Sequence, residues 1–170
     1  SMLVLPTRQP SMTLRITVLL VTLALPAHAQ DWLWWEGETA ASQNFNGRDF
    51  AARNYGDKRE ALSGGDWLCN GGAVGAEPVT ATWKVRVPAD GEWQLWARKF
   101  WKHGPFEWRF DGGKWSACGR DIGLADNVVL APNICANWVA LGPAALKGGE
   151  RTFEIRLTAK QGEPGTACFD

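Results

Sequence analysis

Apolar and polar residues alternate one by one along much of this chain, which is the period of a β-strand with one buried face. In residues 79–87, every odd position is apolar and every even position is polar. The same alternation predicts strands over residues 92–100, 106–110 and 152–157. Shorter strands are expected at residues 33–38, 127–130, 137–141 and 166–170.

Gly, Pro and Asp residues separate these segments, as in the turn signals at residues 88–91 and 111–113. No amphipathic helix follows residue 29, and only residues 59–62 favour a helical turn. About eight short strands separated in this way predict an all-β fold, an antiparallel β-sandwich.

The first 29 residues are expected to lie outside the sandwich. Ser1 and Met2 are typical of a cloning scar or of a start upstream of the natural one, and Met12 opens a secretory signal. An apolar run over residues 16–25 follows, and Ala27 and Ala29 are the small residues that signal peptidase requires. The run is too short to cross a bilayer, although an uncleaved anchor is the alternative.

Cleavage after Ala29 would leave one module, residues 30–170, in a secreted, periplasmic or cell-envelope protein. The chain stops at Asp170 in what is expected to be an opening strand. We therefore expect a truncated last strand and further domains in a larger parent protein.

The charge balance argues against nucleic-acid and lipid partners. The chain has 18 basic and 18 acidic residues; without Arg8 and Arg15 the module keeps 16 and 18, a net charge of −2. A basic stripe for nucleic acid and a polybasic segment for membranes are both absent from the sequence. The module is thus expected to bind neither nucleic acid nor, after cleavage, membranes.

Four cysteines lie in the module, and an even number in an exported protein favours disulfides. Three pairings are possible, and of these we favour Cys118–Cys135, because the segment between them resembles a stapled loop. The other two cysteines are Cys69 and Cys168.

Eleven tryptophans accompany a single tyrosine, and such rings either build an aromatic-rich core or include a surplus that binds a ligand. Alternation assigns Trp83, Trp93 and Trp108 to buried faces, and Trp35 joins them. Trp96 lies on the opposite face of its strand, exposed to solvent or under a loop. Trp138 is expected to pack next to a short strand.

Three further tryptophans fall in or beside Gly-rich connections: Trp67, Trp101 and Trp115. Rings in such loops serve either as lids over the ends of a sandwich or as platforms on which a sugar ring stacks. As platforms they would have three candidate polar partners: Arg98, Lys102 and His103. Arg98 could bind a uronate carboxylate or equally form a cross-strand ion pair.

Four segments of the module form a recognisable set: WEGETA at 35–40, VRVPADGEWQLWAR at 85–98, FDGG at 110–113 and LKGGERTF at 146–153. Together they resemble carbohydrate-binding modules of families 6 and 35, which are galactose-binding-like β-sandwiches with a jelly-roll arrangement. The resemblance covers most of the module, and is more specific for the fold than for the ligand.

The resemblance also implies a structural calcium ion, held by Glu36, Glu38 and Asp170. Residues i and i+2 of a strand point to the same face, so Glu36 and Glu38 would repel each other unless a cation lay between them. Calcium accepts several such oxygen ligands. The alternative is that both are solvated carboxylates on an edge strand.

The function expected from the residues and the resemblance is non-catalytic binding of a polysaccharide or oligosaccharide, which would target a larger polysaccharide-active protein to its glycan. A structural or protein-interaction sandwich of an envelope protein is the first alternative, and a small glycan-active enzyme is the second. Enzyme motifs are scarce: His103 is the module's single histidine, and the sequence has no GxSxG element. Two carboxylates would suffice for a glycosidase, but nothing singles out a pair.

Overall fold

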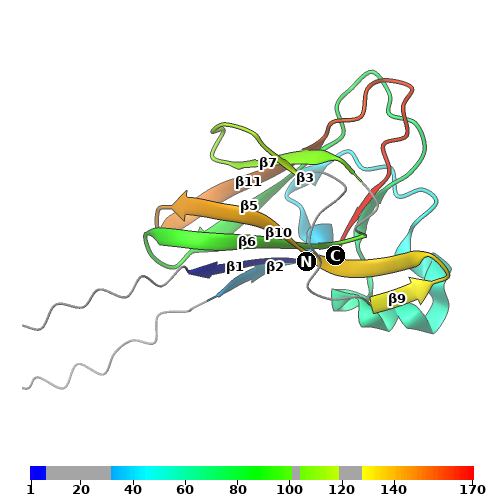
Figure 1. Ribbon diagram of the computed structural model, residues 1–170, viewed down its shortest axis with the longest axis horizontal. Coiled ribbons are helices and arrows are strands. Elements are labelled where there is room, and N and C mark those ends of the chain that lie inside the picture. The colour runs from blue at the N-terminus through cyan, green and yellow to red at the C-terminus, as the bar shows by residue number, and fades with distance from the viewer. Residues whose placement is uncertain (7–31, 101–103, 119–127) are drawn as a thin grey trace, which may run out of the picture.

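The computed structural model describes residues 1–6, 32–100, 104–118 and 128–170, which form two antiparallel β-sheets packed face to face (Figure 1). The expected all-β sandwich is confirmed. In the larger sheet, five strands lie side by side in the order β2 (Leu33–Trp35), β1 (Met2–Pro6), β6 (Gly91–Lys99), β10 (Ile134–Leu146) and β9 (Val128–Ala131). β12 (Ala167–Phe169) joins them by pairing with both β6 and β4 (Leu68–Asn70).

The smaller sheet has five strands. Their order is β3 (Ser42–Gln43), β5 (Thr80–Val87), β11 (Gly149–Leu157), β7 (Phe106–Phe110) and β8 (Ser116–Cys118). Three short 3₁₀ segments lie between β2 and β4: η1 (Gly37–Thr39), η2 (Ala52–Ala61) and η3 (Ser63–Gly65). The helical turn expected at residues 59–62 forms the end of η2. Within the described ranges, no helix is long and apolar enough to span a bilayer.

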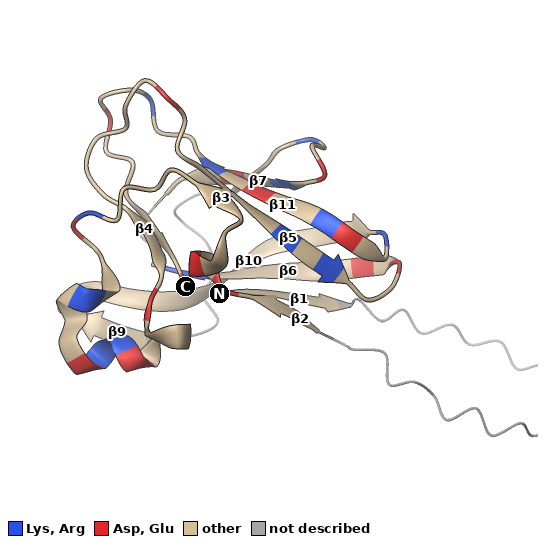
Figure 2. Cartoon of the chain, turned by 180° about the vertical axis from the view of Figure 1, so that it is seen from behind, with Lys and Arg blue, Asp and Glu red and all other residues tan. Residues whose placement is uncertain are grey.

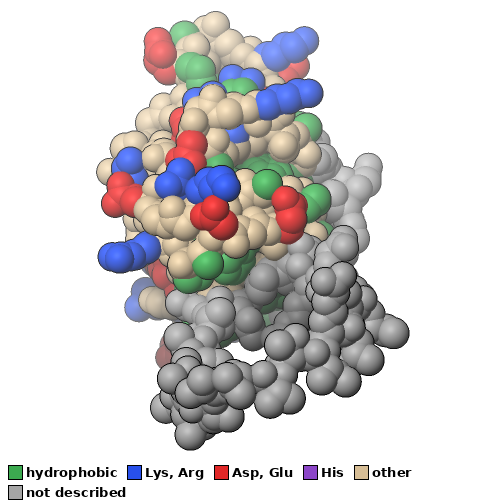
Figure 3. Space-filling view, turned by 90° about the vertical axis from the view of Figure 1, so that its left-hand side faces the viewer, with side chains coloured by type: hydrophobic (Ala, Val, Ile, Leu, Met, Phe, Trp, Pro, Cys, Tyr) green, Lys and Arg blue, Asp and Glu red, His purple; other side chains and the backbone are tan. Residues whose placement is uncertain are grey.

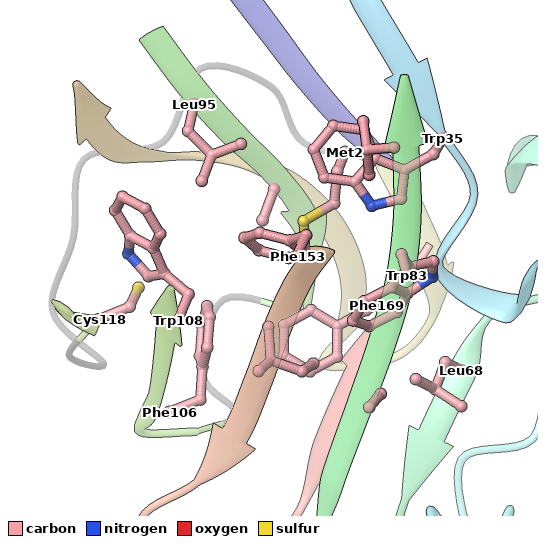
Figure 4. Close-up of a cluster of buried hydrophobic side chains, with 14 of the residues drawn as sticks. Met2, Trp35, Leu68, Trp83, Leu95, Phe106, Trp108, Cys118, Phe153 and Phe169 are labelled. Carbon is pink, nitrogen blue, oxygen red and sulfur yellow. The ribbon is translucent and has the colours of Figure 1, made fainter. Parts of the chain in front are cut away.

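The sandwich core is aromatic, and it contains the tryptophans that alternation assigned to it. Trp35, Trp83, Trp93 and Trp108 are each at most 8% exposed. Phe153 of β11 lies among them, with its ring centre 5.3 Å from that of Trp35 and 5.7 Å from that of Trp83 (Figure 4). Burial of such large rings is the main stabilising contribution to a sandwich of this size.

The first residues of the chain are part of the larger sheet, contrary to the expectation that residues 1–29 lie outside the fold. Met2–Pro6 forms β1, which pairs with β2 on one side and β6 on the other. Met2 and Val4 are fully buried, and Met2 lies beside Trp35 in the core (Figure 4). The segment is short and apolar throughout, so its pattern alone did not distinguish a buried strand from a leader. The expected signal, from Met12 to Ala29, lies outside the described residues.

Glu36 and Glu38 do not share a strand as expected, because β2 ends at Trp35 and Gly37–Thr39 is a 3₁₀ turn. The backbone turns here because Gly37 packs closely against β12: a Cβ on Gly37 would lie 2.3 Å from the carbonyl oxygen of Phe169. Trp83 reinforces the contact, since its indole N–H donates to the carbonyl oxygen of Glu36 over 3.0 Å. The two carboxylates are therefore placed by a turn and not by strand alternation.

Candidate functional site

Trp67 is buried, with only 3% of its surface exposed, so it acts as a lid and offers no face to a ligand. Its indole N–H donates to the carbonyl oxygen of Phe50 over 2.6 Å, and its ring packs edge to face against Tyr55. These contacts belong to a second apolar cluster, formed by η2, β4 and the ends of β9, β10 and β12. Of the two alternatives for Trp67, the structure favours packing.

Arg98 is also buried, and its guanidinium forms an ion pair with Asp170. It donates a second hydrogen bond to the carbonyl oxygen of Ala61 over 2.9 Å. A carboxylate of a sugar would have to displace Asp170, which is itself fully buried. Arg98 is therefore a structural ion-pair residue here. Trp101, Lys102 and His103 lie outside the described residues.

The three carboxylates expected to bind calcium converge around Ser1. Glu36 accepts hydrogen bonds from the Ser1 hydroxyl over 2.5 Å, from the Trp34 indole over 2.6 Å and from the Ser63 hydroxyl over 2.8 Å. The backbone N–H of Ser63 donates to Asp170 over 2.8 Å. Hence most of the carboxylate oxygens already have protein donors.

Burial opposes ionisation of Glu36, but these hydrogen bonds hold its pKa below the ordinary 4.5. Glu38 behaves in the opposite way: burial, with the charges of Glu36 and Asp170, raises its pKa. Burial likewise lowers the pKa of the Ser1 amino group, from 8.0 to about 5. One buried oxygen, Oε2 of Glu38, has no hydrogen-bond partner. No three Asp, Glu, His or Cys side chains in the described ranges are arranged to hold a metal ion.

Of the two candidate platforms that the structure describes, Trp115 is the one that is only partly buried. It precedes β8 and packs against two arginines on the outer face of the smaller sheet. The guanidinium carbons of Arg109 and Arg156 lie 4.1 and 4.3 Å from its ring centre. Such contacts combine cation–π attraction with stacking of planar groups.

Each of these arginines is fixed by a carboxylate on the neighbouring strand. Arg109 of β7 lies opposite Glu154 of β11 and binds it through two hydrogen bonds of 2.7 and 3.0 Å. Arg156 of β11 lies opposite Glu107 and donates to it over 2.6 Å. Both β7 and β11 accordingly carry basic as well as acidic residues (Figure 2). The guanidinium planes beneath Trp115 are thus held in position before any ligand arrives.

An open depression of about 410 Å³ adjoins this pair of strands. Arg156 and Glu107 form part of its wall, and residues 74–78 and 157–161 form most of the rest. We call Trp115, Arg109, Arg156, Glu107, Glu154 and this depression the Trp115 site. An indole beside planar guanidiniums and carboxylates offers an apolar face and bidentate hydrogen bonding at one place, which is how sugars are recognised.

The outer face of the larger sheet carries a second set of indoles. Alternation placed Trp96 on this side, and Trp138 was expected to pack next to a short strand, whereas Trp32 and Trp34 were not singled out from the sequence. Trp34 is 36% exposed, and its ring meets that of Trp138 edge to face with the centres 5.3 Å apart. Leu3 lies between Trp34 and Trp96 in the pairing register. Trp32, 52% exposed, lies next to β2 in the sequence. We call these residues the aromatic face. Trp34 could have been assigned to it, because Trp35 was placed inward and neighbours on a strand point to opposite sides.

Charge is mixed on the face of the molecule that Figure 3 draws. Figure 3 shows basic and acidic side chains interspersed at one end of the molecule. Lys147 and Asp90 form a well-exposed ion pair, with Nζ and Oδ2 2.8 Å apart. Neither sign dominates this view, so shape and ring contacts are a better guide to a ligand than net charge.

Comparisons with known proteins identify no relative of this chain. The chain matches no protein-family model, no curated protein and no solved structure. The Trp115 site and the aromatic face are therefore the features from which a function can be inferred.

Proposed function

We propose that this protein binds carbohydrate without catalysis, and that the Trp115 site is where a sugar ring stacks. The observation that carries the proposal is the partly exposed Trp115 ring beside two arginines, each fixed by a carboxylate. The resemblance to modules of families 6 and 35 supports the same function. Tethering to a polysaccharide-active protein is its natural setting, since it compensates for the weak affinity of one small site.

The site favours a sugar with both an apolar ring face and several hydroxyls or a carboxylate. The Arg109 and Arg156 guanidiniums already bind carboxylates of the protein, and a uronate could share or replace those contacts. Neutral glycans would instead use the remaining acceptor positions of Glu107 and Glu154. Both kinds of glycan belong in the binding test.

Affinity electrophoresis and calorimetry against neutral and uronate-containing polysaccharides would test the proposal. Trp115→Ala should weaken binding at least about tenfold, the change that a loss of about 1.4 kcal/mol produces. Trp34→Ala on the aromatic face is the matched control and should bind as the parent does. If no glycan binds, or if Trp115→Ala binds as well as the parent, the proposal fails.

The aromatic face favours the second candidate function, a protein-interaction sandwich. Trp32, Trp34 and Leu5 are large apolar side chains that remain exposed, and exposed apolar groups of this kind commonly mark contact surfaces. Loss of glycan binding in Trp34→Ala, with Trp115→Ala unaffected, would transfer the sugar site to this face. Release of reducing ends by the protein alone would instead support the glycan-active enzyme.

We propose calcium at Glu36, Glu38 and Asp170 on the strength of the family resemblance, to which the geometry adds the unpartnered Glu38 Oε2. The three carboxylates are not arranged to hold an ion as they stand, so binding would require them to move together. The ion would have to compete with the Ser1 and Arg98 groups that already neutralise these carboxylates. A rise in melting temperature with added calcium, absent in Glu38→Gln, would support it. Equal melting curves with calcium and with a chelator would contradict it.

A further inference from the structure

β1 is held on both edges by neighbouring strands. Its residues pair with Leu33–Trp35 of β2 on one side and with residues 93–97 of β6 on the other. Met2 and Val4 point into the core with no exposed surface, whereas Leu5 points outward and is 37% exposed. A segment bound in this way makes main-chain hydrogen bonds in two directions and fills two apolar pockets.

β12 and β1 pair with the same edge of β6, one after the other. Phe169 of β12 pairs with Lys99, and Met2 of β1 pairs with Ala97. Between them, Arg98 accepts a backbone hydrogen bond from Asp170 over 2.9 Å and donates one to Ser1 over 2.7 Å. The two chain ends accordingly lie side by side in the middle of the sheet (Figure 1). Together, β12 and β1 form one composite strand made of two separate segments.

Among the described residues, no contact of β1 requires the covalent link from Pro6 onward. The partners of β1 are the backbones of β2 and β6 and the core side chains, while its chain neighbours are residues 7–31. The addition of an extended segment to a sheet is a recognised mode of peptide binding, in which main-chain bonds give affinity and alternate side chains give specificity. The segment SMLVLP suits it, since it is uncharged and its alternate residues are apolar.

We propose that the position between β2 and β6 is a strand-acceptor site, which binds the segment Ser1–Pro6 without a covalent link to the rest of the chain. The site selects an extended peptide with apolar side chains at its second and fourth residues. In the intact chain the linked segment occupies the site at a high effective concentration, so a free peptide competes poorly. Cutting the link makes the site exchangeable.

The test uses the full chain with a site-specific protease sequence in place of residues 13–19. The chain is cut after folding, or cut in urea and refolded with both fragments present. Gel filtration should recover the amino-terminal fragment together with the remainder. A fluorescent peptide of residues 1–9 should then exchange into the cut protein and raise its anisotropy, with much less binding to uncut protein.

Two peptide variants distinguish strand insertion from nonspecific adhesion. Val4→Lys puts a charge into the core and should weaken binding more than about 100-fold. Leu5→Lys places the same charge on the exposed side and should change affinity less than about threefold. The proposal is overturned if the fragment elutes apart from a folded remainder, if the cut chain stays unfolded with excess peptide, or if both variants lose affinity equally.

Discussion

Cys69 and Cys168 lie directly opposite each other on the paired strands β4 and β12. Their carbonyl oxygens point away from the pair, to the N–H groups of Gly47 and Phe100. The two residues therefore form a non-hydrogen-bonded pair, in which the Cα atoms are about 4.5 Å apart. This lies within the range that a disulfide spans. None of the four cysteines, all of which the structure describes, forms a disulfide, so the favoured Cys118–Cys135 pairing is not observed.

Refolding in a glutathione redox buffer should join Cys69 to Cys168. Burial raises the pKa of Cys69 to about 11, and it also raises that of Cys168 well above the ordinary value. Few thiolates form in the folded protein, and its oxidation in air should be slow. Peptide mapping after alkylation would identify the bond, and the bond should stabilise the fold by roughly 2–4 kcal/mol. Cys118→Ser with Cys135→Ser is the control variant, and it should behave in the same way. A map that links either residue to Cys118 or Cys135 would contradict the register argument.

Asp170→Asn should destabilise the fold by about 3–5 kcal/mol, because it leaves the buried Arg98 guanidinium without its counter-charge. Asp90→Asn removes a carboxylate from an exposed pair with Lys147 and should leave the free energy of unfolding nearly unchanged. Urea unfolding of the two variants would measure the difference. Equal losses would mean that the Arg98 pair is not buried in solution.

Glu36 and Glu38 should respond to pH in opposite ways. The folded-state pKa of Glu36 is lowered, so its stabilising contribution is present above pH 4.5 and is lost as the pH falls through the lowered value. The folded-state pKa of Glu38 is raised, so the charged form costs stability above that value, and the cost disappears as the pH falls toward 4.5. At pH 7, Glu36→Gln should therefore lower the melting temperature, whereas Glu38→Gln should maintain or raise it. Thermal melts from pH 3 to pH 8 would show this, and a loss in both variants at pH 7 would refute it.

Gly37→Ala should destabilise the protein by about 1–3 kcal/mol, because the new methyl group would overlap the Phe169 carbonyl. Gly75→Ala is the matched control, since nothing lies within 4 Å of a Cβ there. Chemical denaturation of both variants gives the comparison. If Gly37→Ala were as stable as Gly75→Ala, the turn after β2 would not pack on β12 as described.

Alternation predicted the long strands and their buried tryptophans, because side-chain direction on a strand is set locally. It did not predict β1, whose identity as a strand depends on residues about 30 and 90 positions along the chain. Glu36 and Glu38 were placed on one strand because the pattern of residues 33–38 gives no sign of the close approach to Phe169. That contact joins Gly37 to a residue near the C-terminus, so no local window of the sequence contains it.

The candidate site, too, was predicted where it depends on local sequence and missed where it depends on contacts between strands. Trp67 and Trp115 have similar Gly-rich neighbourhoods in the sequence, yet one is covered by Tyr55 and the other is partly open beside Arg109 and Arg156. Those two arginines come from different strands and meet only through the pairing of β7 with β11. The sequence could therefore nominate rings but could not say which ring would be accompanied by charged partners.

The hydrogen bonds of Arg98 have a consequence for chain connectivity. Asp170 supplies the N–H group and Ser1 the C=O group that one residue opposite Arg98 would supply. A circular permutant in which Asp170 is joined straight to Met2, with new termini in the exposed turn at residues 111–113, would thus have an uninterrupted closing strand. The order of the segments in the sequence is thus separable from the architecture that they form. The chain could be reconnected between β12 and β1 without a change in either sheet.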